Sequence, residues 1–187
     1  MSRPSRIDAS LILRVTSLAL VLGLSPVVRA ADPSGVSLYS LALSFLDDSG
    51  REVKLESFRG RLVVLAMFYS ECTSRCPLTL TRLRAVEATF RSRGEAVDIV
   101  LVSFDERESR RSLAKFRKRE GLPAATWHLL RGSEGETDRL ARAIGFGSVM
   151  DLGDHFVHPI RIVRLDPDGT IAKTLDADHR DVVAFVE

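Results

Sequence analysis

Residues 62–77 of the chain read LVVLAMFYSECTSRCP. The first seven of them, Leu62 to Phe68, form a continuous apolar run of strand length, which is typical of a strand covered on both faces of its sheet. Pro77 suits the first turn of a helix, where its missing N–H costs nothing. The stretch therefore predicts a central strand, a loop that contains Cys72 and Cys76, and a helix.

The segments on either side predict alternating strands and helices. Upstream, the turn signature Asp47-Asp48-Ser49-Gly50 separates two short runs and indicates a β-hairpin. Downstream, we expect strands at 97–104, 127–130, 160–165 and 170–175, and helices after Pro77, at about 106–120, at 134–144 and from 179 to the end. The mixed-sign charges of 106–120 indicate a solvated helix face, and the alternating apolar and basic residues of 160–165 indicate an exposed edge strand. The order predicts an α/β fold: a thioredoxin-like sandwich with a central mixed sheet flanked by helices and an N-terminal β-hairpin.

Length and charge indicate one domain without a nucleic-acid partner. The 187 residues, 45% of them hydrophobic, provide enough apolar material for one core but little room for a second. The formal net charge is +2, but residues 1–30 contain four arginines and one aspartate, which leaves 23 basic and 24 acidic residues in the remainder. A nucleic-acid binder would need a basic excess to displace phosphate counterions. We therefore expect a single domain over residues 31–187.

The first 30 residues have the features of an export signal. A positive start precedes the apolar stretch from Val15 to Leu24, and small residues at positions 28 and 30 suit cleavage after Ala30. The alternative is a short uncleaved anchor, although the apolar run ends well short of the roughly 20 residues that span a bilayer. In both cases we expect the domain to work in the periplasm or elsewhere outside the cytoplasm. It would contact a membrane only through an uncleaved signal or a partner.

Cys72 and Cys76 are the only cysteines of the chain. They lie between the predicted central strand and its helix, and ligands of open α/β sheets bind beyond the carboxyl ends of the strands. Sulfurs four residues apart on a first helical turn share one face, and a helix N-terminus favours the thiolate that binds metal or attacks a disulfide. A static disulfide is the alternative, but a bridge across three residues adds little stability through chain entropy. The pattern favours reactive sulfur.

A metal site would need a third ligand. The histidines of the chain are His128, His155, His158 and His179. Copper(I) prefers thiolates and accepts imidazole, whereas a structural zinc site takes four protein ligands. His158 directly precedes the strand predicted at 160–165, at the end of the sheet that faces the cysteine loop. His155 remains an alternative or additional ligand, and Met67 and Met150 are further soft donors, although a single methionine more often fills a core.

Four motifs occur in the order typical of one family. They are FYSECTSRCP from Phe68, VSFDERE from Val102, WHLLRG from Trp127 and HPIRIVRLDPDG from His158. In these motifs the chain resembles the Sco/SenC family of copper proteins, which serve assembly of the CuA centre of cytochrome c oxidase. The resemblance covers about residues 40–175. The Cys-x-x-x-Cys-Pro spacing is the most specific feature, since ordinary thioredoxin-like oxidoreductases carry Cys-x-x-Cys. The resemblance implies that Cys72, Cys76 and His158 bind copper, as Cu(I) or Cu(II).

Three functions are compatible with these residues. The resemblance implies a metallochaperone that passes copper to an apo copper protein such as the CuA-bearing oxidase subunit, with another copper chaperone as a further partner. The alternative is an extracytoplasmic thiol-disulfide oxidoreductase, in which Cys72 and Cys76 reduce the cysteines of an apo copper protein. A peroxidase of the peroxiredoxin type fits less well, because two cysteines share the loop. Asp105 matches an acidic position of the family, where it would either shape the site or cap a helix. We expect a copper-binding protein rather than a classical enzyme.

Overall fold

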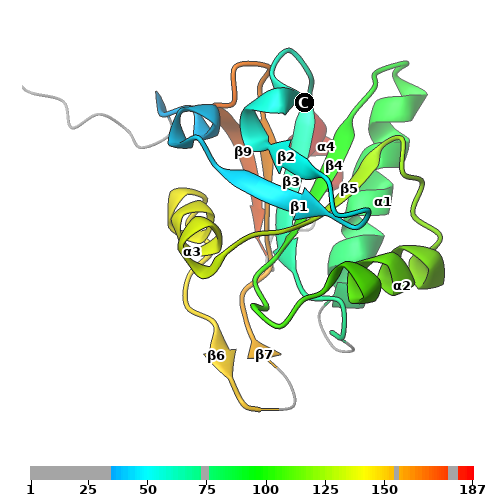
Figure 1. Ribbon diagram of the computed structural model, residues 1–187. Helices are drawn as coiled ribbons and strands as arrows, with labels where there is room; N and C mark the ends of the chain where they lie inside the picture. Colours follow the sequence, from blue (N-terminus) through cyan, green and yellow to red (C-terminus); the bar gives the residue numbers. More distant parts are fainter. Residues whose placement is uncertain (1–34, 73–75, 154–155, 177–180) are drawn as a thin grey trace, which may run out of the picture. The chain divides into compact units, whose positions relative to one another are not determined.

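Three parallel strands lie at the centre of a mixed sheet (Figure 1). They are β3 (Val63–Phe68), β4 (Asp98–Ser103) and β5 (Trp127–Arg131). The structure is a computed structural model that describes residues 35–72, 76–153, 156–176 and 181–187. Over these ranges the sheet has seven strands, in the order β2 (Glu52–Lys54), β1 (Ser44–Asp47), β5, β4, β3, β8 (Arg161–Leu165) and β9 (Ile171–Asp176). Every residue of β3 and β4 is buried, as expected for strands that are covered on both faces.

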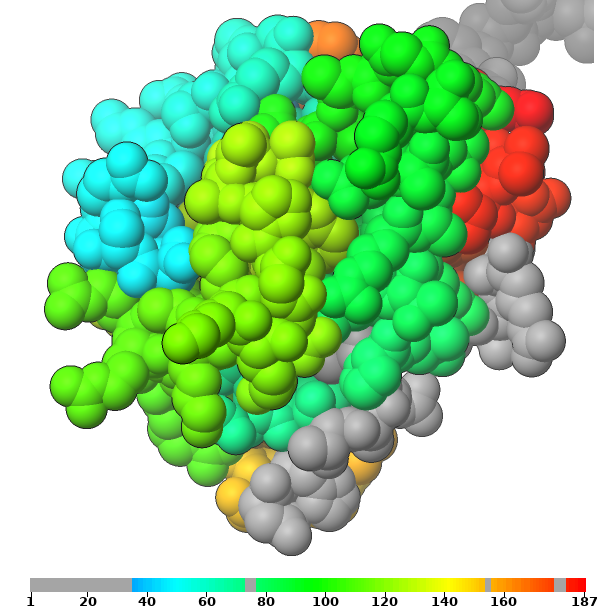
Figure 2. Space-filling model, turned by 90° about the vertical axis from the view of Figure 1, so that its right-hand side faces the viewer, coloured from blue at the N-terminus to red at the C-terminus, as the bar shows by residue number. Residues whose placement is uncertain are grey.

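Helices cover both faces of the sheet and confirm the predicted thioredoxin-like sandwich. One face carries α1 (Cys76–Ser92), α2 (Arg110–Glu120) and α4 (Val182–Val186), and Figure 2 looks onto this side, with α4 in red. The other face carries α3 (Glu134–Ala143) and the 3-10 turns η3 (Leu38–Leu41) and η4 (Leu55–Phe58). Side chains of β3 alternate between the two cores: Ala66 packs in the core beneath α1, and Leu65 in the core beneath α3.

The predicted N-terminal hairpin is present, and a 3-10 turn precedes it. β1 (Ser44–Asp47) and β2 (Glu52–Lys54) pair antiparallel, and β1 joins the sheet beside β5. The preceding apolar residues form η3 instead of extending the strand. The reason is local, because the Ser37 hydroxyl accepts a hydrogen bond from Tyr39 N and begins the 3-10 turn.

The prediction of an exposed edge strand at 160–165 is wrong. β8 (Arg161–Leu165) pairs antiparallel with β3 on one side and with β9 (Ile171–Asp176) on the other. Its arginines bind polar groups at the sheet margin rather than bulk water. Arg164 donates to the carbonyl oxygens of Phe185 and Val186 at the end of α4, and Arg161 pairs with Asp176. Long basic side chains can thus lie in an inner strand when their charged ends reach partners at its edge.

A two-stranded ribbon of β6 (Met150–Asp151) and β7 (Phe156–Val157) projects below the sheet in Figure 1. Strands of two residues carry too little periodicity for a sequence pattern to predict them. The ribbon matters because β7 leads directly into His158. The predicted export signal at 1–30, together with His155 and His179, lies outside the described residues. Within the described ranges, no helix has the length and hydrophobicity that crossing a bilayer requires.

Asp47 organises the turn between β1 and β2. Its Oδ1 accepts hydrogen bonds from the backbone N–H groups of Ser49 at 2.8 Å and Arg51 at 2.9 Å, and its Oδ2 pairs with the Arg51 guanidinium at 3.0 Å. Burial acts to raise the pKa of Asp47, but the hydrogen bonds from Ser49 and Arg51 outweigh burial and hold this pKa below its usual 3.8.

We expect Asp47→Ala to lower the free energy of unfolding at pH 7 by about 2 kcal/mol, since hydrogen bonds to a charged group contribute about 1.5–3 kcal/mol. Because the folded-state pKa is depressed, the carboxylate stabilises the fold fully above the unfolded-state pKa and loses this effect as pH falls through the folded-state pKa. Urea unfolding at pH 7 and at about pH 3 measures the difference between the wild type and the variant. The difference in free energy of unfolding between the two proteins should be smaller at about pH 3 than at pH 7. An equal difference at both pH values would contradict the lowered pKa of Asp47.

Candidate functional site

The cysteine loop begins where β3 ends. Cys72 follows a turn closed by a hydrogen bond from Cys72 N to Tyr69 O at 3.3 Å, and the residue is 5% exposed. Cys76 is the first residue of α1, and its side chain lies outside what the structure describes. The expectation that Cys72 shares the first helical turn with Cys76 is wrong, because Cys72 precedes the helix. It lines a small cavity of about 150 Å³ with Pro77, Leu80 and Phe116.

The fold brings His158 to Cys72 across 86 positions of sequence. The distance between Cys72 Sγ and His158 Nε2 is 3.9 Å, and the histidine is only 4% exposed. Bonds from a first-row metal ion to a thiolate and to an imidazole are about 2.3 Å and about 2.1 Å, as measured at zinc. Because these lengths sum to more than the observed separation, both atoms can bind a single ion without moving.

The hydrogen bond at the other ring nitrogen orients His158. Nδ1 lies 2.8 Å from the carbonyl oxygen of Pro159. A carbonyl oxygen only accepts, so Nδ1 carries a proton and donates it to this bond. In the neutral ring the lone pair is therefore on Nε2, which is the atom that faces Cys72. A backbone carbonyl commonly holds metal-binding histidines in this way.

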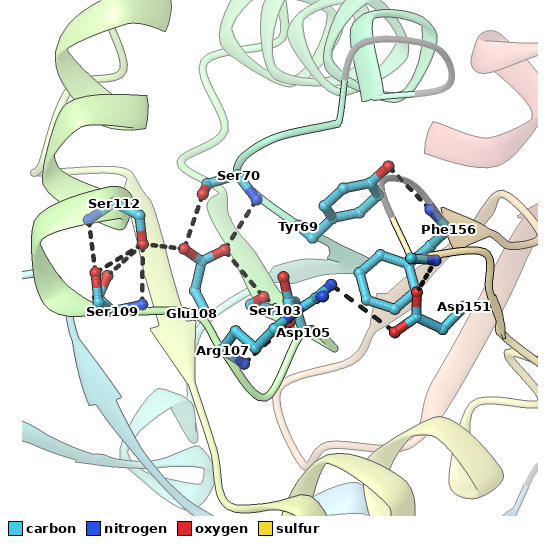
Figure 3. A network of polar contacts seen from close by, with 11 residues as sticks. Tyr69, Ser70, Ser103, Asp105, Arg107, Glu108, Ser109, Ser112, Asp151 and Phe156 are labelled. Atoms are coloured by element: carbon cyan, nitrogen blue, oxygen red, sulfur yellow. Dashed lines mark hydrogen bonds and ion pairs between the residues drawn. The ribbon is translucent and has the colours of Figure 1, made fainter.

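Aromatic rings enclose the His158 ring. The ring centroids of Phe104, Tyr69 and Phe146 lie 4.9, 5.9 and 6.0 Å from that of His158. The Tyr69 hydroxyl also accepts a hydrogen bond from Phe156 N at 3.3 Å, which ties the cysteine loop to β7 (Figure 3). These rings restrict the imidazole and keep water from its sides. Sequence reasoning missed them, although Tyr69 and Phe104 each follow the end of a central strand, where the carboxyl ends of parallel strands meet.

Asp105 does not cap a helix, contrary to one of the two expectations. The cap of α2 is Ser109, which exchanges hydrogen bonds with Ser112 in a capping box. The Asp105 carboxylate instead accepts hydrogen bonds from the backbone N–H and Nε of Arg107, both at 2.9 Å, and Arg107 reaches Asp151 of β6 at 3.9 Å (Figure 3). Asp105 thereby helps to hold the ribbon that leads to His158.

The other candidate donors that the structure describes are Met67, Met150 and His128. Met67 is buried among the residues beneath α3, and Met150 is 60% exposed on β6. His128 Nε2 donates to the Asp98 carboxylate at 2.7 Å, a contact between β5 and β4. Within the described ranges, no three or more His, Cys, Asp or Glu side chains are grouped closely enough to hold a metal ion. Cys72 and His158 are thus the described pair around which a site can form.

The fold and these residues define a thioredoxin-like protein with a thiol and an imidazole side by side at one end of its central sheet. A family model described as SCO1/SenC matches residues 32–185, and the chain belongs to this family.

Known relatives agree with this assignment. An SCO1 protein homolog of Bacillus subtilis (strain 168) is 23% identical over 137 residues, which cover 70% of this chain and 69% of the relative. The structure of Arabidopsis thaliana ScoI with copper bound has a TM-score of 0.67 and 23% identity, over 77% of this chain and 90% of that one. The structure of BsSco has a TM-score of 0.65 and 21% identity, over 76% of this chain and 88% of that one. BsSco is a member of the Sco family of cytochrome c oxidase assembly proteins, and a disulfide switch has been identified in it.

Proposed function

We propose that the chain binds one copper ion through Cys72, Cys76 and His158 and passes it to an apo copper protein. The observation that carries the proposal is the 3.9 Å separation between Cys72 Sγ and His158 Nε2, the nitrogen that the Pro159 hydrogen bond leaves facing the sulfur. Thiolate and imidazole donors suit copper(I), and a third donor from Cys76 would give fewer protein ligands than a structural zinc site takes. The copper-bound ScoI structure supports the choice of metal.

The residues suggest how such a site would hold and release its cargo. Copper binding requires the thiolate form of the cysteines and the neutral form of the imidazole, and the Pro159 carbonyl already selects the ring form with its lone pair toward Cys72. The cavity beside Cys72 gives incoming thiolates of a partner an approach from the side of α1. Thiolates of the partner would then replace Cys72 and Cys76 as ligands of the ion, one at a time.

We assign the recipient to the copper-bearing subunit of a respiratory oxidase, with CuA as the centre that is metallated. The description of BsSco as a cytochrome c oxidase assembly protein supports this choice. The domain would work outside the cytoplasm, either released by cleavage after Ala30 or held by the first 30 residues as an anchor. A second copper chaperone would be the source of the ion.

A second candidate function is thiol-disulfide exchange, which the disulfide switch identified in BsSco favours. One thiolate of the pair attacks a partner disulfide and forms a mixed disulfide, and the second cysteine then displaces the partner's thiol. Cys72 and Cys76 end as a disulfide, the partner ends as a dithiol, and two electrons and two protons have passed between them. Copper binding needs the reduced pair, so both functions can alternate at the same residues.

An anaerobic copper(I) titration of the reduced domain against a chromophoric competitor tests the proposal. We expect one ion per chain, and we expect Cys72→Ser to weaken binding at least about 100-fold, since losing even an outer-shell partner of a ligand costs 10–100-fold. Met150→Ala is the control, because it removes the sulfur of a residue that is 60% exposed, whereas Cys72 and His158 are buried. If Cys72→Ser binds copper as tightly as Met150→Ala does, copper binding at this site is refuted.

A further inference from the structure

Glu108 is a buried carboxylate on which four hydrogen bonds converge (Figure 3). Oε2 accepts from Ser70 N at 2.9 Å and from the Ser103 hydroxyl at 3.1 Å. Oε1 accepts from the Ser70 hydroxyl at 2.8 Å and from the Ser112 hydroxyl. The side chain is in a segment whose mixed charges predict a solvated surface, yet the residue is 7% exposed. A buried carboxylate is costly unless hydrogen bonds compensate for lost hydration.

Two of these four bonds hold Ser70, which lies two residues before Cys72. The carbonyl oxygen of Ser70 is held as well, because Arg119 donates to it at 2.8 Å. The backbone N–H, the carbonyl and the hydroxyl of Ser70 are therefore all bound by residues from the segment between β4 and the end of α2. This arrangement fixes the position and the direction of the chain as it leaves β3.

The neighbouring residue connects the same loop to the histidine. Tyr69 contacts the His158 ring and accepts the hydrogen bond from Phe156 N, and its carbonyl oxygen accepts from Cys72 N. Consecutive Cα atoms are about 3.8 Å apart, so anchoring Ser70 leaves Cys72 on a tether of two residues. The place of the Cys72 sulfur relative to Nε2 thus depends on Ser70, and Ser70 depends on Glu108.

We infer that Glu108 is a positioning residue for the site: it sets the separation of Cys72 Sγ and His158 Nε2 without contacting either. Its link to copper affinity rests on the proposed function, whereas its hold on the loop does not. Glutamine should substitute well, because its oxygen can accept from Ser70 N and its NH₂ group can donate to the hydroxyls of Ser70 and Ser112. Alanine removes all four bonds and should release the loop.

A copper-free measurement tests the hold on the loop. With Cys76→Ser as background, Cys72 is the only cysteine, and its alkylation by iodoacetamide reports access to the buried sulfur. We expect Glu108→Ala to raise the alkylation rate at least about 10-fold, and Glu108→Gln to stay within about twofold of the background, because only the first variant frees Ser70. Asp47→Ala is the matched control, since it removes a buried, hydrogen-bonded carboxylate from the β1–β2 turn. Equal acceleration by Asp47→Ala and Glu108→Ala would overturn the inference, because general loss of stability would then explain both.

The copper readout is the second arm and uses both native cysteines. Glu108→Ala should weaken copper(I) binding by about 10–100-fold, as expected for an outer-shell residue. It should also shift the thiolate-to-copper(II) absorption band. Glu108→Gln and Asp47→Ala should keep the affinity and the band of the wild type. An unchanged affinity and band in Glu108→Ala would overturn the link between Glu108 and the site. Should the wild type bind no copper, the proposed function fails, and the alkylation rates alone then decide whether Glu108 holds the loop.

Discussion

His158→Ala should lower the copper(I) affinity of the reduced protein at least about 100-fold, because loss of a ligand exceeds the 10–100-fold effect of losing its outer-shell partner. The structure places Nε2 3.9 Å from Cys72 Sγ and occupies Nδ1 with the Pro159 carbonyl, so no other atom of this ring faces the sulfur. Reduction of a partner disulfide should largely survive, since that reaction uses only the sulfurs of Cys72 and Cys76. The variant therefore separates the two candidate functions.

His155→Ala provides the matched control for this experiment. The two histidines lie three residues apart, and the sequence alone leaves both as candidate ligands. Competitive copper titration and turnover of a model disulfide, measured on the same three proteins, give the affinity and the exchange rate. We expect His155→Ala to match the wild type in both. A strong loss of affinity in His155→Ala with little loss in His158→Ala would transfer the ligand role to His155 and refute the present assignment.

The sequence predicted the inner sheet well because burial on both faces leaves an unmistakable pattern. β3 is a continuous apolar run and β4 contains one at 99–102, and each strand lies between helices in the structure. For β8 the pattern gave a wrong prediction, because Arg161 and Arg164 resemble residues that face solvent. Their partners are Asp176 and the carbonyl oxygens at the end of α4, which only the assembled fold brings near. Local alternation cannot distinguish water from such distant acceptors.

For the candidate site, the sequence indicated Cys72 and His158, which the fold brings together, but not the residues that hold them in place. Thiol and imidazole side chains bind metals, and each of these two residues lies in a motif that the sequence shows: Cys72 in FYSECTSRCP and His158 in HPIRIVRLDPDG. The role of the residues that hold this pair in place depends on contacts between segments that are distant in sequence. Glu108 binds Ser70, and the Phe104 ring packs against His158. The charged segment 106–120 illustrates the problem. Arg117, which looks solvated in the sequence, binds Asp48 at 2.6 Å and is 17% exposed, because α2 packs against the β1–β2 turn.

Gly169→Ala should produce the largest loss of stability among the substitutions considered. Gly169 has a φ of 88°, a backbone conformation that strains other residues, and its carbonyl accepts a hydrogen bond from Leu38 N at 2.9 Å. A Cβ at this position would lie 2.6 Å from Ser37 Oγ and would overlap the buried ring of Tyr39. Backbone strain of about 1 kcal/mol and overpacking of about 1–3 kcal/mol add to about 3 kcal/mol. For a domain of this size, the midpoint of thermal unfolding should fall by roughly 6–12 °C.

Gly60→Ala isolates the steric part of this loss. Gly60 has nearly the same φ, 82°, and donates to Pro167 O in the same region, but a Cβ there meets no atom within 4 Å. It should therefore show only the backbone strain, about 1 kcal/mol, or roughly 2–4 °C in the unfolding midpoint. Calorimetry of the reduced, metal-free variants measures both midpoints under the same conditions. The two glycines have nearly the same φ and differ in what surrounds them. Equal losses of stability in the two variants would therefore mean that Ser37 and Tyr39 move aside for the new methyl group, and that the segment containing them is not held firmly against the turn at Gly169.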